Sequence, residues 1–96
     1  MSEWRFAQND PADQLAILHH FCVKKQQEGQ DVEFVITVKE FATPKEEPMR
    51  FIATADKQVF QTGVPFHPVG WGTTLLKALA ECIAQIKQFP YEGEAQ

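Results

Sequence analysis

The stretch GWGTTLLKALAECIAQIKQFP, residues 70–90, places the strongest constraint on the fold of this chain. It begins with a turn framed by two glycines, continues with apolar residues at helical spacing and ends at Pro90, which cannot continue a helix. A helix with such a wide apolar face has to bury it against another element. Because the chain has only 96 residues, we expect one domain, residues 1–96, built around a single core.

Alternating apolar and polar residues predict strands ahead of this helix. The clearest run is 32–39, in which every second residue from Val32 to Val38 is apolar. Two similar runs follow it, and prolines with clustered charge separate the first run from the second. The expected strands cover residues 32–39, 49–55 and 59–64, with a loop at 42–48, a turn at 56–58 and an irregular segment at 64–72.

A first helix is predicted for residues 11–28. Asp10 and Pro11 are residue types that begin helices, and Gly29 is one that ends them. The apolar residues at three- and four-residue spacing between them are Leu15, Leu18, Phe21 and Cys22. The expected fold is therefore α+β: a single αβββα domain with a three-stranded antiparallel sheet and two helices packed on one face. Its structured core covers about residues 10–89, with short tails.

The composition excludes several classes of protein. The net charge of −4 argues against a broad nucleic-acid-binding surface, because affinity for phosphates depends on clustered Lys and Arg. The start of the chain lacks an export signal, and no apolar run approaches the ~18 residues that span a bilayer. Cys22 and Cys82 are expected to be free and buried, as in a reducing compartment. We therefore expect a soluble cytoplasmic protein with no membrane partner.

Metal binding and catalysis are not expected. His19 and His20 are neighbours, and on a helix their side chains would point about 100° apart, which makes a shared ion difficult. Cys82 lies within an apolar helical stretch, where burial makes a thiol inert. No spacing of Cys and His matches a metal signature. We therefore expect no metal, no cofactor and no catalytic residue.

The element order and the turn GWGTT resemble the double-stranded-RNA-binding domain family over residues from about 10 to 89. In that family a GxGxS loop leads into a helix that contains a pair of small residues. The matching positions are Gly70 and Gly72 for the loop glycines, Thr74 for its Ser, Ala78 for the helix alanine, and Cys82 with Ile83 for the small pair. The resemblance implies the αβββα fold and a surface that corresponds to the RNA-facing surface of that family.

The regions with which that family contacts RNA differ in this chain. Leucines stand where the family has phosphate-binding lysines, and only Lys77 remains nearby, on another face of the helix. In the loop after the first strand Pro44 is kept, but Glu46 stands near the expected His, and a carboxylate repels the RNA backbone. The leucines at the phosphate positions are Leu75, Leu76 and Leu79.

The turn GWGTT has two interpretations. Its backbone N–H groups and hydroxyls could surround a phosphate, or they could simply begin a helix. The second interpretation is favoured, because the turn lacks the Lys or Arg side chains that usually accompany phosphate binding. The residues that would contact an anion or a nucleic acid are Gly70, Gly72, Thr73, Thr74 and Lys77.

The apolar excess of the last helix favours a non-catalytic interaction module. A helix on one sheet face needs an apolar stripe about 100° wide, and these residues extend beyond it, so part of the surface should face outward. A self-complementary patch closes most simply as a two-fold homodimer, and a different protein partner is the other form of the hypothesis. The expected interaction surface comprises Trp71, Leu75, Leu76, Leu79, Phe89 and Tyr91.

Two alternative functions remain open. A small enzyme is one. The other is weak binding of double-stranded RNA or another nucleic acid, which requires the fold to gather basic residues on one surface. The basic residues concerned are Lys24, Lys25, Arg50, Lys57, Lys77 and Lys87.

Overall fold

The computed structural model describes residues 3–7, 14–42 and 49–92 of the chain. A short 3-10 helix lies near the N-terminus, strands make up the middle, and an α-helix lies near the C-terminus. The elements are η1 Glu3–Ala7, β1 Ala16–Gln27, β2 Gln30–Phe41, β3 Phe51–Ala55, β4 Val59–Gln61, β5 Val64–Phe66, β6 Val69–Gly72 and α1 Leu75–Gln88. The expected helix start at Asp10 and Pro11 and most of the expected loop at 42–48 lie outside the described residues.

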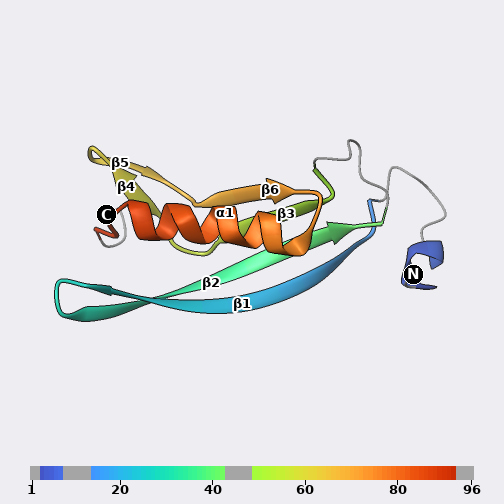
Figure 1. Cartoon of the computed structure of the whole chain (residues 1–96), viewed down its shortest axis with the longest axis horizontal. Helices are drawn as coiled ribbons and strands as arrows, with labels where there is room; N and C mark the ends of the chain where they lie inside the picture. Colours follow the sequence, from blue (N-terminus) through green and yellow to red (C-terminus); the bar gives the residue numbers. More distant parts are fainter. Residues whose placement is uncertain (1–2, 8–13, 43–48, 93–96) are drawn as a thin grey trace.

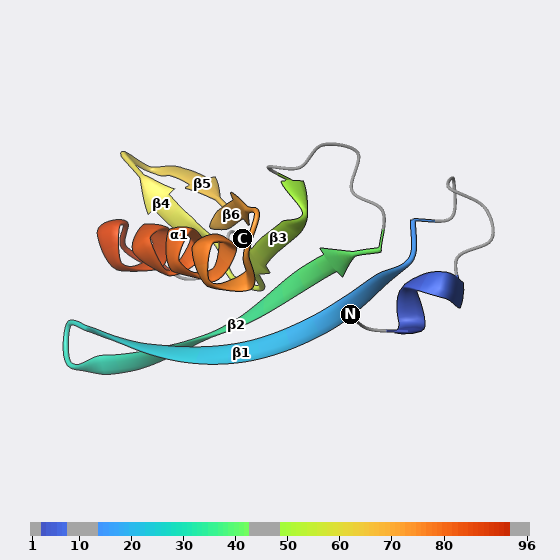
Figure 2. The same ribbon diagram turned by 45° about the vertical axis from the view of Figure 1, so that its right-hand side comes forward.

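Four antiparallel strands form the main sheet in the order β1-β2-β3-β6, and β4 pairs with β5 in a separate two-stranded sheet. α1 packs on one face of the main sheet, mostly against β3 and β6 (Figure 1). The turned view in Figure 2 shows the long β1–β2 hairpin as a curved ribbon that extends beyond the helix layer. The domain therefore has two layers, with β1 at one edge of the main sheet and β6 at the other.

Two tight turns of the same kind close the hairpins. Glu28 and Gly29, with φ of 53° and 78°, join β1 to β2. Thr62 and Gly63, with φ of 53° and 79°, join β4 to β5. Two central residues with positive φ form a type I′ turn, whose twist matches that of the flanking strands. These turns therefore set the register of both hairpins.

The core lies between α1 and the main sheet. Alternate residues of β2 point to the helix and are completely buried, because the strand is central in the sheet and its side chains alternate between faces. Each large apolar side chain buried in this way contributes about 1.5–3 kcal/mol. The core consists of Phe34, Ile36, Val38, Ala53, Ala55, Val59, Ala78, Cys82 and Ile86.

The predicted helix at residues 11–28 is wrong. From Ala16 to Gln27 this segment is strand β1, and Glu28 and Gly29 form a hairpin turn rather than a helix end. Phe21 and Val23 point to the helix side, and their neighbours point away, so the sequence satisfies a two-residue period as well as a helical one. Pairing along the full length of β2 favours the strand.

The αβββα architecture is therefore wrong, although the α+β class is confirmed. The main sheet has four strands instead of three, and α1 is the one α-helix among the described residues. The expected strand at 59–64 is interrupted by the turn at Thr62, and the segment at 64–72, expected to be irregular, contains β5 and β6. The element order on which the resemblance to the RNA-binding family rests is not the order of this structure.

The helix predicted from the stretch at residues 70–90 is confirmed. α1 begins at Leu75, and Gln88 is its last residue, shortly before Pro90. The strand predicted at 32–39 lies within β2, and the strand predicted at 49–55 contains β3. Within the described residues no helix has the length and apolar character to cross a membrane.

Candidate interaction surface

The glycines of the GWGTT turn allow α1 to approach β6 closely. A Cβ atom on Gly70 would lie 2.0 Å from the carbonyl oxygen of Ala78, and one on Gly72 would lie 2.8 Å from Cβ of Lys77. Glycine fits here because it brings no Cβ atom into the space that the helix occupies. Trp71 lies between the two glycines in the strand, so its side chain points to the opposite face of the sheet.

The two threonines lie at the start of α1. Thr74 is the N-cap residue, and its hydroxyl oxygen accepts a hydrogen bond from the Lys77 N–H at 3.1 Å. Thr73 is exposed and precedes the cap. Together with the packing of Gly70 and Gly72 against the helix, this geometry favours helix initiation as the role of the turn.

Side chains of α1 cover the outer edge of β6. The Gln85 side chain accepts a hydrogen bond from the Val69 N–H at 3.0 Å and donates one to the Val69 carbonyl oxygen at 2.9 Å. The Glu81 carboxylate accepts one from the Trp71 N–H at 3.4 Å. These backbone groups point away from β3 and would otherwise be open to another strand. The β6 edge is therefore closed by the chain itself.

The outer edge of β1 is open. In a two-residue hairpin the residues beside the turn, Gln27 and Gln30, form a doubly hydrogen-bonded pair, and such pairs recur at every second residue. The bond from the Asp56 N–H to the Val35 carbonyl oxygen, directed away from β1, agrees with this alternation. The backbone groups of the intervening β1 residues point outward, and no described residue bonds to them. We call these residues the free edge: Ala16, Leu18, His20, Cys22, Lys24 and Gln26.

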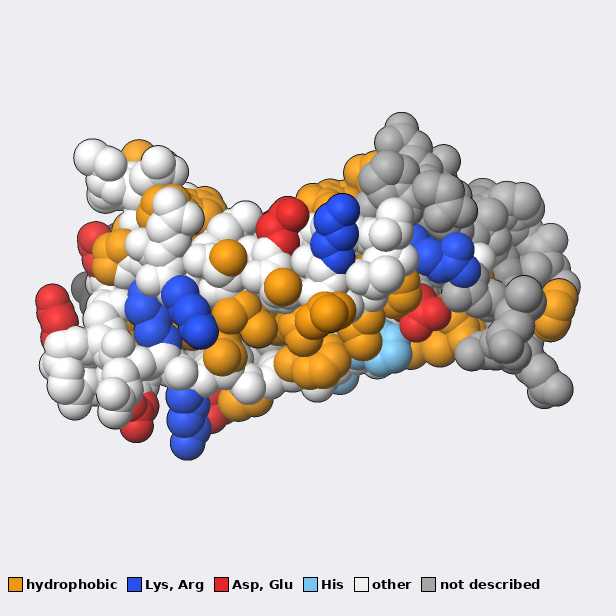
Figure 3. All heavy atoms as spheres, viewed as in Figure 1, with side chains coloured by type: hydrophobic (Ala, Val, Ile, Leu, Met, Phe, Trp, Pro, Cys, Tyr) orange, Lys and Arg blue, Asp and Glu red, His pale blue; other side chains and the backbone are white. Residues whose placement is uncertain are grey.

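An apolar patch borders the free edge on the helix side of the sheet. Gln85 and Glu81 lie on the flank of α1 that faces β6, since both bond to that strand. Successive helix residues are about 100° apart, and this spacing places leucine and isoleucine on the opposite flank. Figure 3 shows hydrophobic side chains gathered between α1 and β1. We call this the α1–β1 patch. Its residues are Phe21, Val23, Leu76, Leu79 and Ile83, of which Leu76 is 76% exposed and the others are half-buried.

The residues expected to form one interaction surface lie in three places. Leu75, Leu76 and Leu79 are on α1, and the first and third of them pack against the core. Trp71, 37% exposed, lies on the face of the sheet opposite to α1, where Leu18 is also exposed. The sequence therefore predicted the exposed leucine on α1 but did not reveal that Trp71 faces the other way.

The two aromatic residues after α1 take part in packing. The Phe89 ring contacts Phe66 edge to face with centroids 5.1 Å apart, and Tyr91 contacts Phe34 in the same manner at 6.0 Å. The backbone N–H and carbonyl oxygen of Tyr91 both bond to the side-chain amide of Gln27. Phe89 and Tyr91 thus attach the end of the chain to the hairpin and the core.

Two of the basic residues, Lys25 and Lys57, have partners within the fold. Lys25 donates hydrogen bonds to the carbonyl oxygens of Ile86 and Phe89 at 2.7 and 2.6 Å, which satisfies the C-terminal end of α1, and burial lowers the pKa of Lys25. Lys57 donates to the Glu33 carbonyl oxygen at 2.7 Å. Lysines with these partners serve the fold rather than a phosphate.

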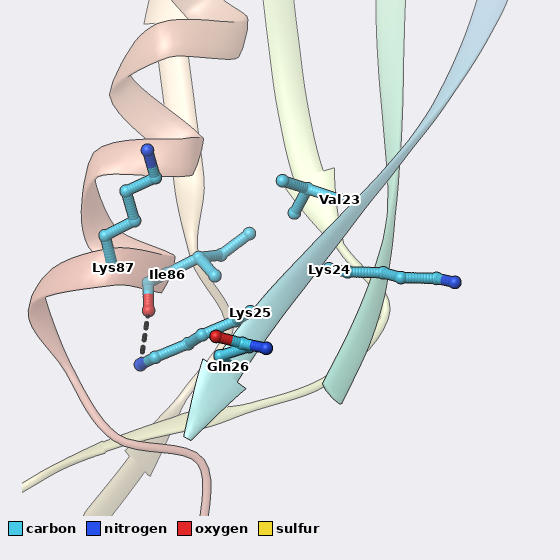
Figure 4. A pocket seen from close by; sticks show the side chains of 6 residues that line it. All are labelled: Val23, Lys24, Lys25, Gln26, Ile86 and Lys87. Atoms are coloured by element: carbon cyan, nitrogen blue, oxygen red, sulfur yellow. Dashed lines mark hydrogen bonds between the residues drawn. The ribbon is translucent and has the colours of Figure 1, made fainter. Parts of the chain in front are cut away.

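A shallow hollow of about 270 Å³ lies between β1 and the end of α1. Three lysines line it, Lys24, Lys25 and Lys87, together with Val23, Gln26 and Ile86. Figure 4 shows that their ammonium groups point in different directions and that Lys25 is bound to the helix carbonyl. The hollow therefore lacks the convergent charges of an anion site.

The cysteines and histidines have no catalytic arrangement among the described residues. Burial raises the pKa of the Cys82 thiol to about 11. Cys22 was expected to be buried but is exposed on the free edge, and desolvation together with Glu33 raises its thiol pKa. His19 bonds to Glu40 at 3.0 Å and His20 to the Thr37 hydroxyl at 3.2 Å. No cluster of three metal-ligating side chains occurs in the part of the chain that the structure describes.

The free edge and the β1 residues of the α1–β1 patch are features that the sequence analysis missed, although it named Leu76 and Leu79. The two-residue turn EG, between residues that alternate in polarity, was a signal for the hairpin, but strand order and edge position depend on the whole fold. Comparisons with protein families, with curated proteins and with solved structures found no match for this chain.

Proposed function

We propose that this chain is a non-catalytic protein-interaction module that binds a partner strand at the free edge of β1. The observation that carries the proposal is the contrast between the two edges of the main sheet. α1 side chains occupy the β6 edge, whereas the outward backbone groups of β1, a row about 36 Å long, bond to no residue that the structure describes. A long open edge is a template for pairing with another chain.

The α1–β1 patch supports the same site. It lies beside the free edge on one face of the sheet, so a strand added to β1 would place its side chains next to Phe21 and Val23. Main-chain hydrogen bonds would then supply the pairing, and burial of this patch would add apolar contact. Self-association as a homodimer is the simplest form of the proposal, because one copy provides both strand and edge.

The alternatives have less support from the geometry. A nucleic-acid site has less support, because Lys25 and Lys57 are bonded within the fold, the three lysines of the hollow point in different directions, and the net charge is −4. A raised thiol pKa disfavours Cys82 as a nucleophile, because the thiolate is the reactive form. We therefore retain the interaction module as the function that the described residues fit best.

Light scattering over a range of micromolar concentrations tests the proposal. The native chain should approach twice its mass of 10.9 kDa as concentration rises. His20→Pro removes an N–H that points away from β2, so it should return the chain to a monomer while the β1–β2 ladder and the circular dichroism spectrum are kept. A native chain of 10.9 kDa at every concentration contradicts the proposal in this form.

His20→Ala is the matched control. Both variants lose the exposed contact of the His20 ring with Thr37, but only the proline variant loses the outward N–H. The alanine variant should therefore associate as the native chain does. If both variants remain dimeric, the interface lies elsewhere than at the free edge.

A further inference from the structure

We infer that the strand added at the free edge is β1 of a second copy, paired antiparallel about a two-fold axis at His20. This inference rests on the proposed function and adds the occupant and its register. A two-fold axis perpendicular to the sheet pairs the β1 edges of the two copies, and the face that carries α1 is on the same side in both. The two four-stranded sheets would then join into one continuous sheet, with both α1 helices on the same face.

The charges along β1 favour a second copy in the antiparallel direction. β1 contains no acidic residue, and its lysines, Lys24 and Lys25, lie near one end. An antiparallel copy brings its lysines to the other end of the paired segment, whereas a parallel copy would set like charges side by side. An acidic partner strand is less favoured, because Lys25 is already bonded to carbonyl oxygens at the end of α1. The remaining run, 16–23, contains no Lys, Arg, Asp or Glu, and an identical run can pair with it without repulsion between such charges.

The side chains of the free edge and the patch fit this register. With His20 on the axis, Leu18 pairs with Cys22 of the second copy on the face of the sheet opposite to α1. On the face of α1, Ile17 pairs with Val23 of the second copy, and the symmetric contacts repeat across the axis. These two pairs join apolar side chains, which stabilises neighbouring strands, and the same register sets His19 opposite Phe21 and His20 opposite His20 of the second copy.

Registers displaced towards the lysines are less favourable. With the axis at His20, Lys24 lies opposite Ala16 of the second copy, at the end of the overlap where its ammonium group keeps its water. One residue further on, Lys24 would lie opposite Leu18, and with the axis at Cys22 it would lie opposite His20. The register at His20 is the longest overlap that leaves both lysines at the ends of the paired run.

Disulfide trapping reads the register directly. His20 belongs to the free edge, so the two copies of residue 20 form a hydrogen-bonded pair with Cα atoms about 5.5 Å apart, within the range of a disulfide. The two Cys22 residues would be displaced along the strands by roughly 14 Å, too far to bridge. Cys82 is buried with a raised pKa and stays out of the reaction.

The experiment oxidises the full-length chain mildly and follows its mass on a non-reducing gel. His20→Cys in a Cys22→Ser background should shift the band from 10.9 kDa to twice that mass, and Leu18→Cys with native Cys22 should do the same. Gln26→Cys in the Cys22→Ser background is the matched control, on the same edge but outside the overlap, and should stay monomeric on the gel.

Each alternative register has its own signature. Cross-linking of the native chain through Cys22 would place the axis at that residue and overturn the inference. If His20→Cys cross-links only when Cys22 is present, residue 20 lies opposite residue 22 of the second copy and the axis is at Phe21. That result would also overturn the inference. If the native chain dimerises in light scattering but neither designed pair links, the register is wrong and the proposed function stands. A monomeric native chain overturns both.

Discussion

Gly70→Ala tests whether the GWGTT turn exists to pack α1 against β6. The new Cβ atom would lie 2.0 Å from the carbonyl oxygen of Ala78 and 2.8 Å from the backbone nitrogen of Cys82. Both are backbone atoms of a buried helix segment, so no change of rotamer relieves the overlap. Because ordinary contact begins at 3.4 Å, α1 has to move away from the sheet by more than 1 Å.

The cost follows from the contacts that this movement opens. Ala78, Cys82 and Ile86 hold α1 in the core, and a gap of about 1 Å loses up to about half of the dispersion energy of each contact. Overpacking usually costs about 1–3 kcal/mol, and with backbone on both sides we expect about 3 kcal/mol here. For a domain of this size that lowers the melting temperature by roughly 12–24 °C.

Thermal and urea unfolding, followed by circular dichroism, measure the loss against two further glycines. Gly72→Ala meets the side chain of Lys77 at 2.8 Å and should cost less, since that side chain can shift. Gly63→Ala enters open space and should cost about 1 kcal/mol, the strain of alanine at a positive φ. If Gly70→Ala costs no more than Gly63→Ala, the packing role of the turn is refuted.

Two further outcomes concern Lys25, which bonds to the C-terminal end of α1, and Cys82, which lies in the middle of that helix. Lys25→Met should lower the free energy of unfolding by about 1–2 kcal/mol, because it removes the bonds to the last carbonyl oxygens of the helix. Lys24 is an exposed neighbour, so Lys24→Met should be close to neutral in the same urea titration. The pKa of Cys82 is raised from 9.0 to about 11, so as the pH rises the unfolded chain releases the thiol proton at a lower pH than the folded chain does. The stabilisation that is present below pH 9 is therefore lost as the pH rises towards 11. Unfolding of Cys82→Ala in parallel isolates that loss, and an identical pH dependence of the two chains would contradict it.

The sequence was sufficient to predict α1 and β2 because each has one unambiguous period. From Leu75 to Gln88 the apolar residues follow the helical period between an N-cap threonine and a proline, and from Val32 to Val38 they follow the strand period. Local capping and alternation agree with the tertiary packing in both cases. Where the local pattern and the packing agree in this way, the local sequence is sufficient to predict the element.

β1 was not predictable in this way because its residues satisfy two periods. Leu18, Phe21 and Cys22 recur at helical spacing, while Phe21 and Val23 share the face towards α1 at strand spacing. Pairing with β2 decides between the two, and that pairing depends on a turn in which Glu28 takes a positive φ, an unusual conformation for glutamate. The deciding information therefore lies in a contact between segments rather than in the segment itself.

The candidate interaction site illustrates the same limit. The outward leucine of α1 could be anticipated from the width of the apolar stripe, and Leu76 is indeed exposed. The side of the sheet that Trp71 faces depends on recognising β6 as a strand whose glycines lie under the helix. The free edge of β1 depends on strand order, which no local pattern contains.

The two flanks of α1 connect the sequence to the proposed site. On the flank towards β6, Gln85 and Glu81 bond to the backbone of the outer strand, so the polar residues there close an edge. On the opposite flank, Leu76 and Ile83 form no such bonds and face β1, the strand whose outer edge bonds to none of the described residues. A chain that had only to remain monomeric would gain from polar side chains at both places, since an exposed edge and an exposed patch each promote association. The protection of one edge together with the apolar character beside the other is the arrangement expected of a domain whose β1 edge is completed by another chain.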